Sequence, residues 1–242
     1  MPGITITGLT KRFGQVGAVV GLDLSVRPGE LVALLGPSGC GKTTTLRLVA
    51  GFLAPEAGEI RVGDRVLSSP ALVVPPERRR MAMIFQSYAL WPHMTVAQNV
   101  AYGLRFAGVG RADRDRRVDE MLRAVQLDGY GARYPGELSG GQQQRVAVAR
   151  AVATQPKLVL ADEPTANLDG ENAELLMHLM RDLRDRHGMT FMFSTHDPRV
   201  VAHAVRVVTL VDGRVARDEQ KPGEAPHEIK SISGTGLTPA TG

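Results

Sequence analysis

The chain has 242 residues, of which 43% are hydrophobic, and this is enough to bury the core of one large domain. Its net charge of +4 is small and no long basic run is present, so we expect no nucleic-acid partner. The single cysteine excludes an intrachain disulfide and favours a reducing compartment. We find neither a signal-peptide pattern nor a run of ~18 apolar residues that could span a bilayer. Any action at a membrane is therefore expected to occur from the cytoplasmic face through a partner.

The N-terminal part of the chain predicts strands followed by one helix. Residues 4–9 and 20–26 alternate apolar and polar side chains, which indicates two half-buried strands. Residues 31–35 are continuously apolar and predict a buried strand, and residues 44–50 predict a helix. Phe13 lies between the first two strands, where a lone aromatic side chain is more often explained by packing than by ligand contact.

A glycine-rich loop connects the buried strand to the helix. Its residues are Gly36, Pro37, Ser38, Gly39, Cys40, Gly41, Lys42 and Thr43, followed by Thr44. A strand, the spacing G-x-x-x-x-G-K-[ST] and a helix together define a P-loop. Its glycines let backbone N–H groups surround a phosphate, and the helix N-terminus adds partial positive charge. We expect Lys42 to reach the β- and γ-phosphates of a nucleotide and the Thr43 hydroxyl to bind Mg²⁺.

The middle of the chain changes from strands to helices. A short strand at 59–62 precedes a loop with prolines and arginines at 68–80, in which we expect the three consecutive arginines to be solvated. An apolar stretch at 81–85 ends at Gln86. Helices are predicted at 95–106, where Thr95-x-x-Gln98 is a capping box, and at 112–125.

The C-terminal half alternates helices and strands. Helices are predicted at about 139–153 and 171–187, and strands at 157–161, 189–194, 205–211 and 214–216. We expect a P-loop NTPase core of the α/β class with a mostly parallel sheet, an N-terminal antiparallel β subdomain, and an α-helical lobe inserted at about 87–150, all within residues 1–217. Residues 218–242 are polar and rich in proline and glycine, which predicts a disordered tail.

Two carboxylates follow the strand at 157–161. In a P-loop fold this strand ends beside the phosphate site, at the carboxyl edge of the sheet. Asp162 would then hold Mg²⁺ through its water shell, and Glu163 would polarise the attacking water. A capped turn is the structural alternative for this Asp-Glu-Pro sequence.

A second candidate anion site lies at the start of the helix at 139–153. Ser139, Gly140 and Gly141 open this helix, where backbone N–H groups and the helix dipole favour negative charge. Simple N-capping by Ser139 is the alternative, although capping alone does not explain the two glycines.

At this point the chain resembles the ATP-binding cassette (ABC) ATPases, the nucleotide-binding subunits of ABC transporters, over about residues 4–217. The resemblance rests on the order of the motifs GPSGCGKT at 36–43, Gln86 after a strand, LSGGQQQR at 138–145, LVLADEP at 158–164, NLD at 167–169 and STHD at 194–197. The signature LSGGQ between a P-loop and an Asp-Glu strand end is close to diagnostic.

The resemblance implies roles for further residues. Phe13 matches the aromatic residue that stacks on adenine, and Gln86 matches a residue that contacts Mg²⁺ or water and senses the membrane partner. Ser139, Gly140, Gly141 and Gln142 belong to the signature that contacts ATP bound to the opposite subunit. Asp169 matches a residue that communicates across that interface, with N-capping as its alternative, and His196 matches the switch histidine near the γ-phosphate.

These roles imply a head-to-tail dimer of ABC ATPase subunits, as a homodimer or a heterodimer, with two ATP molecules and Mg²⁺ between the chains. They also imply that polytopic membrane permease subunits are partners, and that the chain is peripheral at the cytoplasmic face of the inner membrane.

The branch of the family is less uniform along the chain. Residues 75–79 and 85–96 resemble importer ATPases for sugars, polyamines or ferric iron, which would add a solute-binding protein as a partner. Those subunits usually carry a C-terminal β-rich domain that we expect to be absent here. Residues 161–169 and 193–198 resemble lipoprotein-releasing and macrolide-type export ATPases. We favour import because the Gln86 region contacts the membrane subunit, with export and a soluble non-transport ABC protein as the alternatives.

Overall fold

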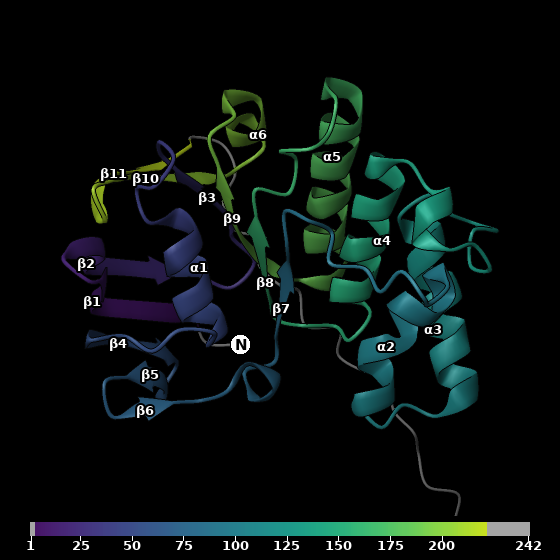
Figure 1. The fold of residues 1–242 in the computed structure, drawn as a ribbon, viewed down its shortest axis with the longest axis horizontal. Helices are drawn as coiled ribbons and strands as arrows, with labels where there is room; N and C mark the ends of the chain where they lie inside the picture. Colours follow the sequence, from purple (N-terminus) through teal and green to yellow (C-terminus); the bar gives the residue numbers. More distant parts are fainter. Residues whose placement is uncertain (1–2, 222–242) are drawn as a thin grey trace, which may run out of the picture.

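The computed structural model of the chain describes residues 3–221 and contains two β-sheets with helices around them (Figure 1). The first sheet is antiparallel and has the strand order β2-β1-β4-β5-β6. Its strands are β1 (Ile4–Phe13), β2 (Val16–Val26), β4 (Ala57–Val62), β5 (Arg65–Ser69) and β6 (Leu72–Val73). The expected N-terminal antiparallel β subdomain is therefore confirmed.

The second sheet is mostly parallel and has the strand order β11-β10-β3-β9-β8-β7. Its strands are β3 (Leu31–Leu35), β7 (Met81–Ile84), β8 (Leu158–Asp162), β9 (Thr190–Thr195), β10 (Arg206–Val211) and β11 (Arg214–Gln220). Only β11 runs antiparallel to its neighbour. The parallel strands all end at one edge, and the loops at that edge carry most of the candidate site residues.

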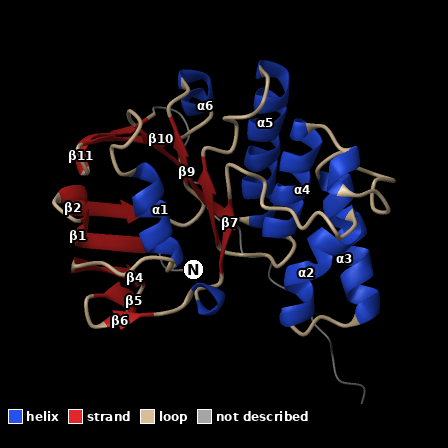
Figure 2. Ribbon diagram, viewed as in Figure 1, coloured by secondary structure: helices blue, strands red, loops and turns tan. Residues whose placement is uncertain are grey.

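Helix α1 (Lys42–Ala50) lies between the two sheets (Figure 2). Its buried side chains, Leu46 and Val49 among them, share one apolar core with the inner faces of both sheets. Along β3, Val32 and Leu34 face this core, whereas Leu31 and Ala33 face a second core on the other side of the sheet. A continuously apolar strand is thus explained by burial on both faces.

The remaining helices cover the second core. They are α2 (Val96–Phe106), α3 (Arg111–Ala124), α4 (Gly140–Val152), α5 (Gly170–His187) and α6 (Pro198–Ala202), with short 3₁₀ turns at Pro76–Arg78 and Pro135–Glu137. Helices α2, α3 and α4 pack against one another, and Figure 1 shows them on the side away from the antiparallel sheet. The Thr95–Gln98 capping box at the start of α2 is present as predicted. Among residues 3–221, no helix combines the length and the apolar composition needed to cross a bilayer.

The stretch 68–80 differs from the expected loop. It contains the end of β5 and all of β6, and Arg79, predicted to be solvated, is only 3% exposed. The Arg79 guanidinium donates hydrogen bonds to Ser68 Oγ and to the carbonyl oxygens of Leu48, Val49, Leu67 and Val74. It closes the C-terminal end of α1, where backbone carbonyls lack partners within the helix. The arginine is therefore structural.

Two further boundaries differ from the sequence-based prediction. Phe13 is the last residue of β1 and pairs with Val16 of β2, so it does not lie in a connecting loop. Strand β11 continues to Gln220, where residues 218–220 pair with β10, and this short part of the predicted tail is ordered. The rest of the predicted disordered tail lies outside the described residues.

Candidate active site

The P-loop takes the predicted place between β3 and α1. Gly41 has a φ of 105°, in the left-handed region, and a Cβ atom there would collide with the carbonyl oxygen of Ala18. Gly39 has a φ of 81°. Both positions require glycine because other residues rarely adopt this backbone conformation. The side chain of Cys40 is 4% exposed and packs in the core, so only the backbone of Cys40 can serve a phosphate.

Lys42 lies at the centre of this loop. It is 5% exposed, and its Nζ donates to the carbonyl oxygens of Gly36 at 2.6 Å and Pro37 at 2.9 Å. Within the described part of the chain, no carboxylate forms an ion pair with Lys42. Buried charges are normally paired, so this ammonium group fits an anionic ligand. A cavity of about 120 Å³ opens here, lined by Ser38, Gly39, Gly41, Lys42, Thr43, Thr44 and Glu163.

Asp162 is the last residue of β8, and its side chain binds both the P-loop and the neighbouring strand β9. Its Oδ1 accepts hydrogen bonds from Thr43 Oγ1 at 2.7 Å and from Ser194 Oγ at 2.8 Å. Asp162 is 7% exposed. A carboxylate beside a threonine hydroxyl offers the hard oxygen ligands that Mg²⁺ prefers. The predicted Mg²⁺ residues Thr43 and Asp162 are therefore neighbours in space.

Glu163 begins the loop after β8 with a left-handed φ of 45°. The Glu163 N–H donates to Ser194 Oγ at 2.9 Å, which holds this unusual conformation in place. His196 Nδ1 lies 3.3 Å from Glu163 Oε1, and the two side chains are 63% and 20% exposed. A second cavity of about 160 Å³ is lined by Glu163, Thr165, Ala166, Leu168, Thr195, His196 and Asp197. Glu163 thus borders both cavities, one on the P-loop side and one on the His196 side.

Gln86 lies at the same sheet edge, two residues after the end of β7. Its backbone carbonyl accepts a hydrogen bond from Asn167 Nδ2 at 3.0 Å, and its side chain is exposed. The strand order β3-β9-β8-β7 therefore brings the P-loop, His196, Asp162 and Gln86 to neighbouring positions.

The signature residues open helix α4. Ser139 is the N-cap: its hydroxyl accepts from the Gln142 N–H at 3.3 Å, and Gln142 Oε1 accepts from the Ser139 N–H at 2.9 Å. A Cβ atom on Gly140 would press on the Tyr88 hydroxyl, and one on Gly141 would collide with the Asn172 side chain. Close packing therefore explains both glycines, contrary to our argument that capping leaves them unexplained. The capping alternative is present, and contact with a nucleotide stays a prediction.

Asp169 is the N-cap of α5 and accepts a hydrogen bond from the Asn172 N–H at 2.8 Å. Hydrogen bonds from the Asn172 backbone and side chain lower the pKa of Asp169. The capping alternative is thus present for Asp169 as well. Phe13, in contrast, is 52% exposed, so packing does not account for it.

Two site residues carry roles that the sequence analysis did not assign. Ser194 binds both Asp162 and the Glu163 backbone, as described above. Arg150, in the last turn of α4, donates to the carbonyl oxygens of Tyr88 and Ala89 and lies over the Trp91 ring. The left-handed φ values of Tyr88 (61°) and Ala89 (50°) mark a tight turn there. The only sequence signal for Ser194 was its place as the first residue of the STHD motif at 194–197.

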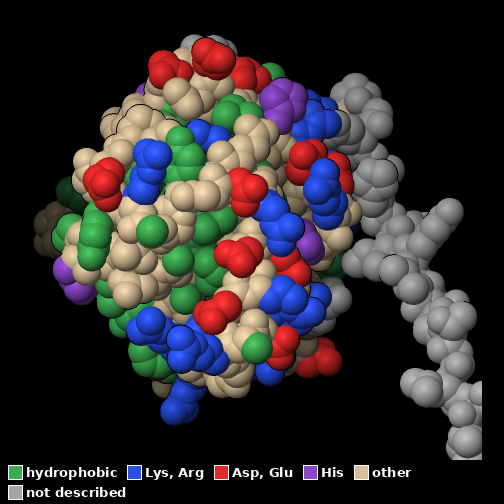
Figure 3. Space-filling model, turned by 90° about the vertical axis from the view of Figure 1, so that its right-hand side faces the viewer, with side chains coloured by type: hydrophobic (Ala, Val, Ile, Leu, Met, Phe, Trp, Pro, Cys, Tyr) green, Lys and Arg blue, Asp and Glu red, His purple; other side chains and the backbone are tan. Residues whose placement is uncertain are grey.

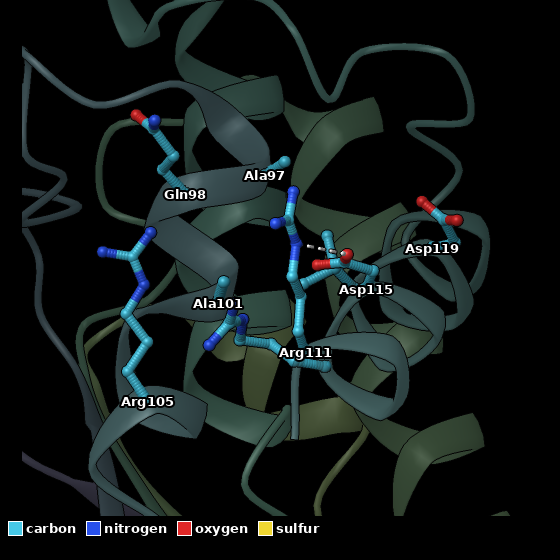
Figure 4. Close-up of a pocket in the computed structure, with 9 residues that line it drawn as sticks. Ala97, Gln98, Ala101, Arg105, Arg111, Asp115 and Asp119 are labelled. Carbon is cyan, nitrogen blue, oxygen red and sulfur yellow. Dashed lines mark ion pairs between the residues drawn. The ribbon is translucent and has the colours of Figure 1, made fainter. Parts of the chain in front are cut away.

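A groove of about 480 Å³ lies between α2 and α3, away from the P-loop (Figure 4). Ala97, Ala101 and Val118 form its apolar part. Its charged residues are Arg105, Arg111, Arg114, Asp115 and Asp119, and Arg111 pairs with Asp115 at 3.9 Å. Figure 3 shows this side of the molecule, where basic and acidic side chains surround exposed hydrophobic ones.

The fold and the site together define a P-loop nucleotide-binding protein. Residues 19–166 match a protein-family model described as "ABC transporter", and the chain therefore belongs to the ABC transporter family of ATP-binding cassettes. Its structure is similar to the dimeric post-hydrolysis structure of the ATP-binding cassette MJ0796 bound to ADP and Pi. The TM-score is 0.82 at 33% identity, over 91% of this chain and 100% of that one.

Two curated relatives are similar over most of the chain. The Fe(3+) ions import ATP-binding protein FbpC of Rhizobium etli is 45% identical over 215 residues, which cover 88% of this chain and 60% of the relative. The spermidine/putrescine import ATP-binding protein PotA of Pseudomonas aeruginosa is 45% identical over 232 residues, covering 96% and 61%. The chain thus spans about three fifths of the length of these relatives.

Proposed function

We propose that the chain is the ATP-binding and ATP-hydrolysing subunit of an ABC transporter and that its ATP turnover powers solute import. One observation carries this proposal. The buried ammonium group of Lys42, which forms no ion pair with a carboxylate of residues 3–221, lies at the same sheet edge as two carboxylates. Lys42 begins α1, whereas Asp162 and Glu163 are consecutive residues at the end of β8. Lys42 and Glu163 line the same cavity, and Asp162 accepts a hydrogen bond from Thr43 beside it.

The P-loop side of this region suits the phosphates of ATP. Exchanging the Gly36 and Pro37 carbonyls for phosphate oxygens would give Lys42 the anionic partner that it lacks. Thr43 and Asp162 would hold Mg²⁺, which neutralises charge on the phosphate oxygens when it is bound. Phe13 offers an exposed aromatic face for adenine.

The residues around Glu163 are arranged as ATP hydrolysis requires. Glu163 borders the P-loop cavity and is 20% exposed, so its carboxylate can accept a proton from a water molecule aimed at the γ-phosphate. His196 contacts Glu163 Oε1 and would orient it, and Gln86 lies at the same edge to hold the water or the metal. Because Ser194 fixes the Glu163 backbone, the carboxylate is positioned before substrate arrives.

A second chain would complete each site. All residues that line the P-loop cavity come from the loop, the first turn of α1 and Glu163. The exposed start of α4, with Ser139 and Gly140, would supply the remaining phosphate contacts from the opposite chain of a head-to-tail dimer. Asp169 would lie at that interface. The dimeric arrangement of the MJ0796 cassette supports this proposal.

The names of the curated relatives favour import over export, since both are import ATP-binding proteins. We propose that the chain works at the cytoplasmic face of the inner membrane on polytopic permease subunits. The groove between α2 and α3 offers them an apolar floor with charges on both sides. A solute-binding protein would be a further partner of the import complex. Affinity purification from membranes would identify the permease directly.

Glu163→Gln tests the proposed chemistry. The amide keeps the size of the side chain but cannot accept a proton, so phosphate release should fall by ~10²–10⁴-fold. ATP binding should persist because Lys42 and the loop amides are unchanged, and ATP–Mg should then hold the variant as a dimer on size-exclusion chromatography. Phosphate release at the wild-type rate would refute the role of Glu163. Loss of both turnover and ATP binding would point to a folding defect, so only loss of turnover with an ATP-dependent dimer supports the role of Glu163.

Ser139→Arg tests the two-chain site. A bulky cation at the start of α4 should leave ATP binding by the isolated chain intact and abolish turnover, because it blocks closure of the dimer. Ser139→Ala is the matched comparison: it removes the N-cap, which costs about 1 kcal/mol of stability, and one hydroxyl contact to the phosphate, but it adds no bulk, so turnover should fall less than in Ser139→Arg. If Ser139→Arg prevents ATP binding by the monomer, Ser139 does not act across an interface.

A further inference from the structure

Three side chains that can bind metal come together between helix α5 and the residue that follows α6. Glu174 and His178 are four residues apart on α5 and therefore share one face of the helix. His203 follows α6 directly and approaches them from the side. Its Nε2 lies 2.8 Å from Glu174 Oε2, and its ring meets the His178 ring edge to face at 5.1 Å between centroids.

We propose that Glu174, His178 and His203 form a binding site for a transition-metal ion of the zinc class, which links α5 to the segment that follows α6. Two imidazoles and one carboxylate are a donor set that proteins use for Zn²⁺, with water as the fourth ligand. The proposal goes beyond ATP binding and hydrolysis, because none of the three residues takes part in the site described above.

The spacing of the donors suits such an ion. One ligand atom from each of the three residues can be chosen so that all lie within 4.8 Å of one another. Zn–N and Zn–O bonds of about 2.0–2.2 Å place tetrahedral donors about 3.4 Å apart. Closing the site therefore requires side-chain rotation of no more than about 1.5 Å, which the exposed Glu174 and His178 side chains can make.

The environment of His203 fixes which nitrogen faces the site. The His203 side chain is only 10% exposed, and its buried Nδ1 has no hydrogen-bond partner among residues 3–221. Here the ring is held through Nε2 alone, and Nε2 points at Glu174. The Glu174 side chain is 49% exposed, so an ion and its water ligand have access from solvent.

A bound metal ion would connect α5 to the α6 segment, and both begin close to candidate active-site residues in the sequence. Helix α5 begins directly after its N-cap Asp169, and α6 begins two residues after His196. A metal bond between Glu174 or His178 and His203 would restrain movement of one segment relative to the other. Binding to the folded chain should also raise its stability, because the three ligands are brought together only by folding.

The test uses the full chain without nucleotide and Zn²⁺ alone, titrated by calorimetry. The wild-type chain should bind one Zn²⁺ per chain and melt at a higher temperature when Zn²⁺ is present. His178→Ala and Glu174→Gln should each weaken Zn²⁺ binding at least tenfold and remove most of the increase in melting temperature. His187→Ala, which changes an exposed histidine on the same helix, should behave as the wild type.

Co²⁺ provides a second measurement, since three protein ligands and one water should give the intense visible absorption of a four-coordinate ion. His203→Ala is less informative because it removes a buried ring and so also disturbs the packing of the fold. The test therefore relies on the variants of the two exposed ligands, His178→Ala and Glu174→Gln. Absence of Zn²⁺ binding by the wild-type chain would overturn the proposal. So would His178→Ala and Glu174→Gln binding as tightly as the wild type, because the ion would then occupy another site, such as that of Asp162.

Discussion

The Ser194 hydroxyl donates a hydrogen bond to Asp162 Oδ1 at 2.8 Å across neighbouring parallel strands. Ser194 Oγ also accepts a hydrogen bond from the Glu163 N–H at 2.9 Å, so one buried serine positions both carboxylate residues. Because a hydroxyl group can donate and accept at once, serine is suited to this place between β8 and β9.

Ser194→Ala should therefore lower turnover more than substrate affinity. It leaves the partly buried Glu163 N–H without its acceptor, which costs about 1 kcal/mol of stability, and leaves the Asp162 carboxylate with the Thr43 hydrogen bond alone. We expect kcat for ATP to fall about tenfold while KM changes little, since Lys42 and the loop amides are untouched. Steady-state phosphate release at varied ATP measures both constants. An unchanged kcat in a folded variant would show that Ser194 does not position the carboxylates.

The local motifs were predictable because their geometry is fixed by neighbouring residues. A buried strand, a glycine loop and a helix determine where Lys42 and Thr43 lie, and the apolar run of β8 places Asp162 at its end. The role of Ser194 depends instead on β9 lying between β3 and β8, which no pattern within one strand determines. Arg79 was misassigned for a related reason, because the carbonyls that it binds come from α1, from β5 and from Val74, which follows β6.

Arg79→Met should destabilise the fold without touching the site. The substitution keeps an unbranched side chain but removes every donor to the carbonyls at the end of α1, so we expect a loss of at least about 3 kcal/mol. Burial, followed by the charge of Arg65, lowers the pKa of Arg79 to about 10, which shows how far the guanidinium is removed from water. Urea unfolding measures the change, and Arg80→Met, at an exposed neighbour, is the control. Equal stability of the two variants would contradict the structural role of Arg79.

The ion pair between Arg206 and Asp218 should make the end of β11 sensitive to acid. Arg206 donates two hydrogen bonds to the Asp218 carboxylate, at 2.7 and 2.6 Å, and these lower the pKa of Asp218. A lowered folded-state pKa stabilises the fold above the unfolded value of ~3.9, and this stabilisation is lost as the pH falls through the folded pKa.

Asp218→Asn should therefore lower stability at pH 7 by at most about 1 kcal/mol, or roughly 2–4 °C in Tm, and the difference should vanish in acid. Thermal melts from pH 7 downward measure it. Glu219→Gln, which removes the neighbouring and more exposed carboxylate, should change Tm less. A difference between Asp218→Asn and wild type that grows on acidification would contradict the assignment.

Arg150 connects the helix of the signature residues to the turn that follows Gln86. Its guanidinium binds the carbonyls of Tyr88 and Ala89 and lies 5.1 Å from the centroid of the Trp91 ring, and burial lowers its pKa. Tyr88 also reaches the other end of α4, where its hydroxyl lies beside Gly140. A change in the turn is thus expected to reach both ends of the helix that begins with Ser139.

Arg150→Ala should release this turn, and Trp91 reports it, because the chain has a single tryptophan. Without the guanidinium over its ring, Trp91 should become more exposed, and its fluorescence emission should shift to longer wavelength. We expect kcat to fall about tenfold with little change in KM for ATP, as suits a residue that acts through its neighbours.

Arg150→Lys keeps the charge but not the two-pronged geometry of the guanidinium, so it should restore only part of the Trp91 emission and of kcat. Arg123→Ala should leave emission and kcat unchanged, because this arginine of α3 donates only to the Asp119 carbonyl within the described part of the chain. If Arg150→Ala shifts the emission but keeps the wild-type kcat, the turn does not take part in turnover. If neither changes, Arg150 does not hold the turn.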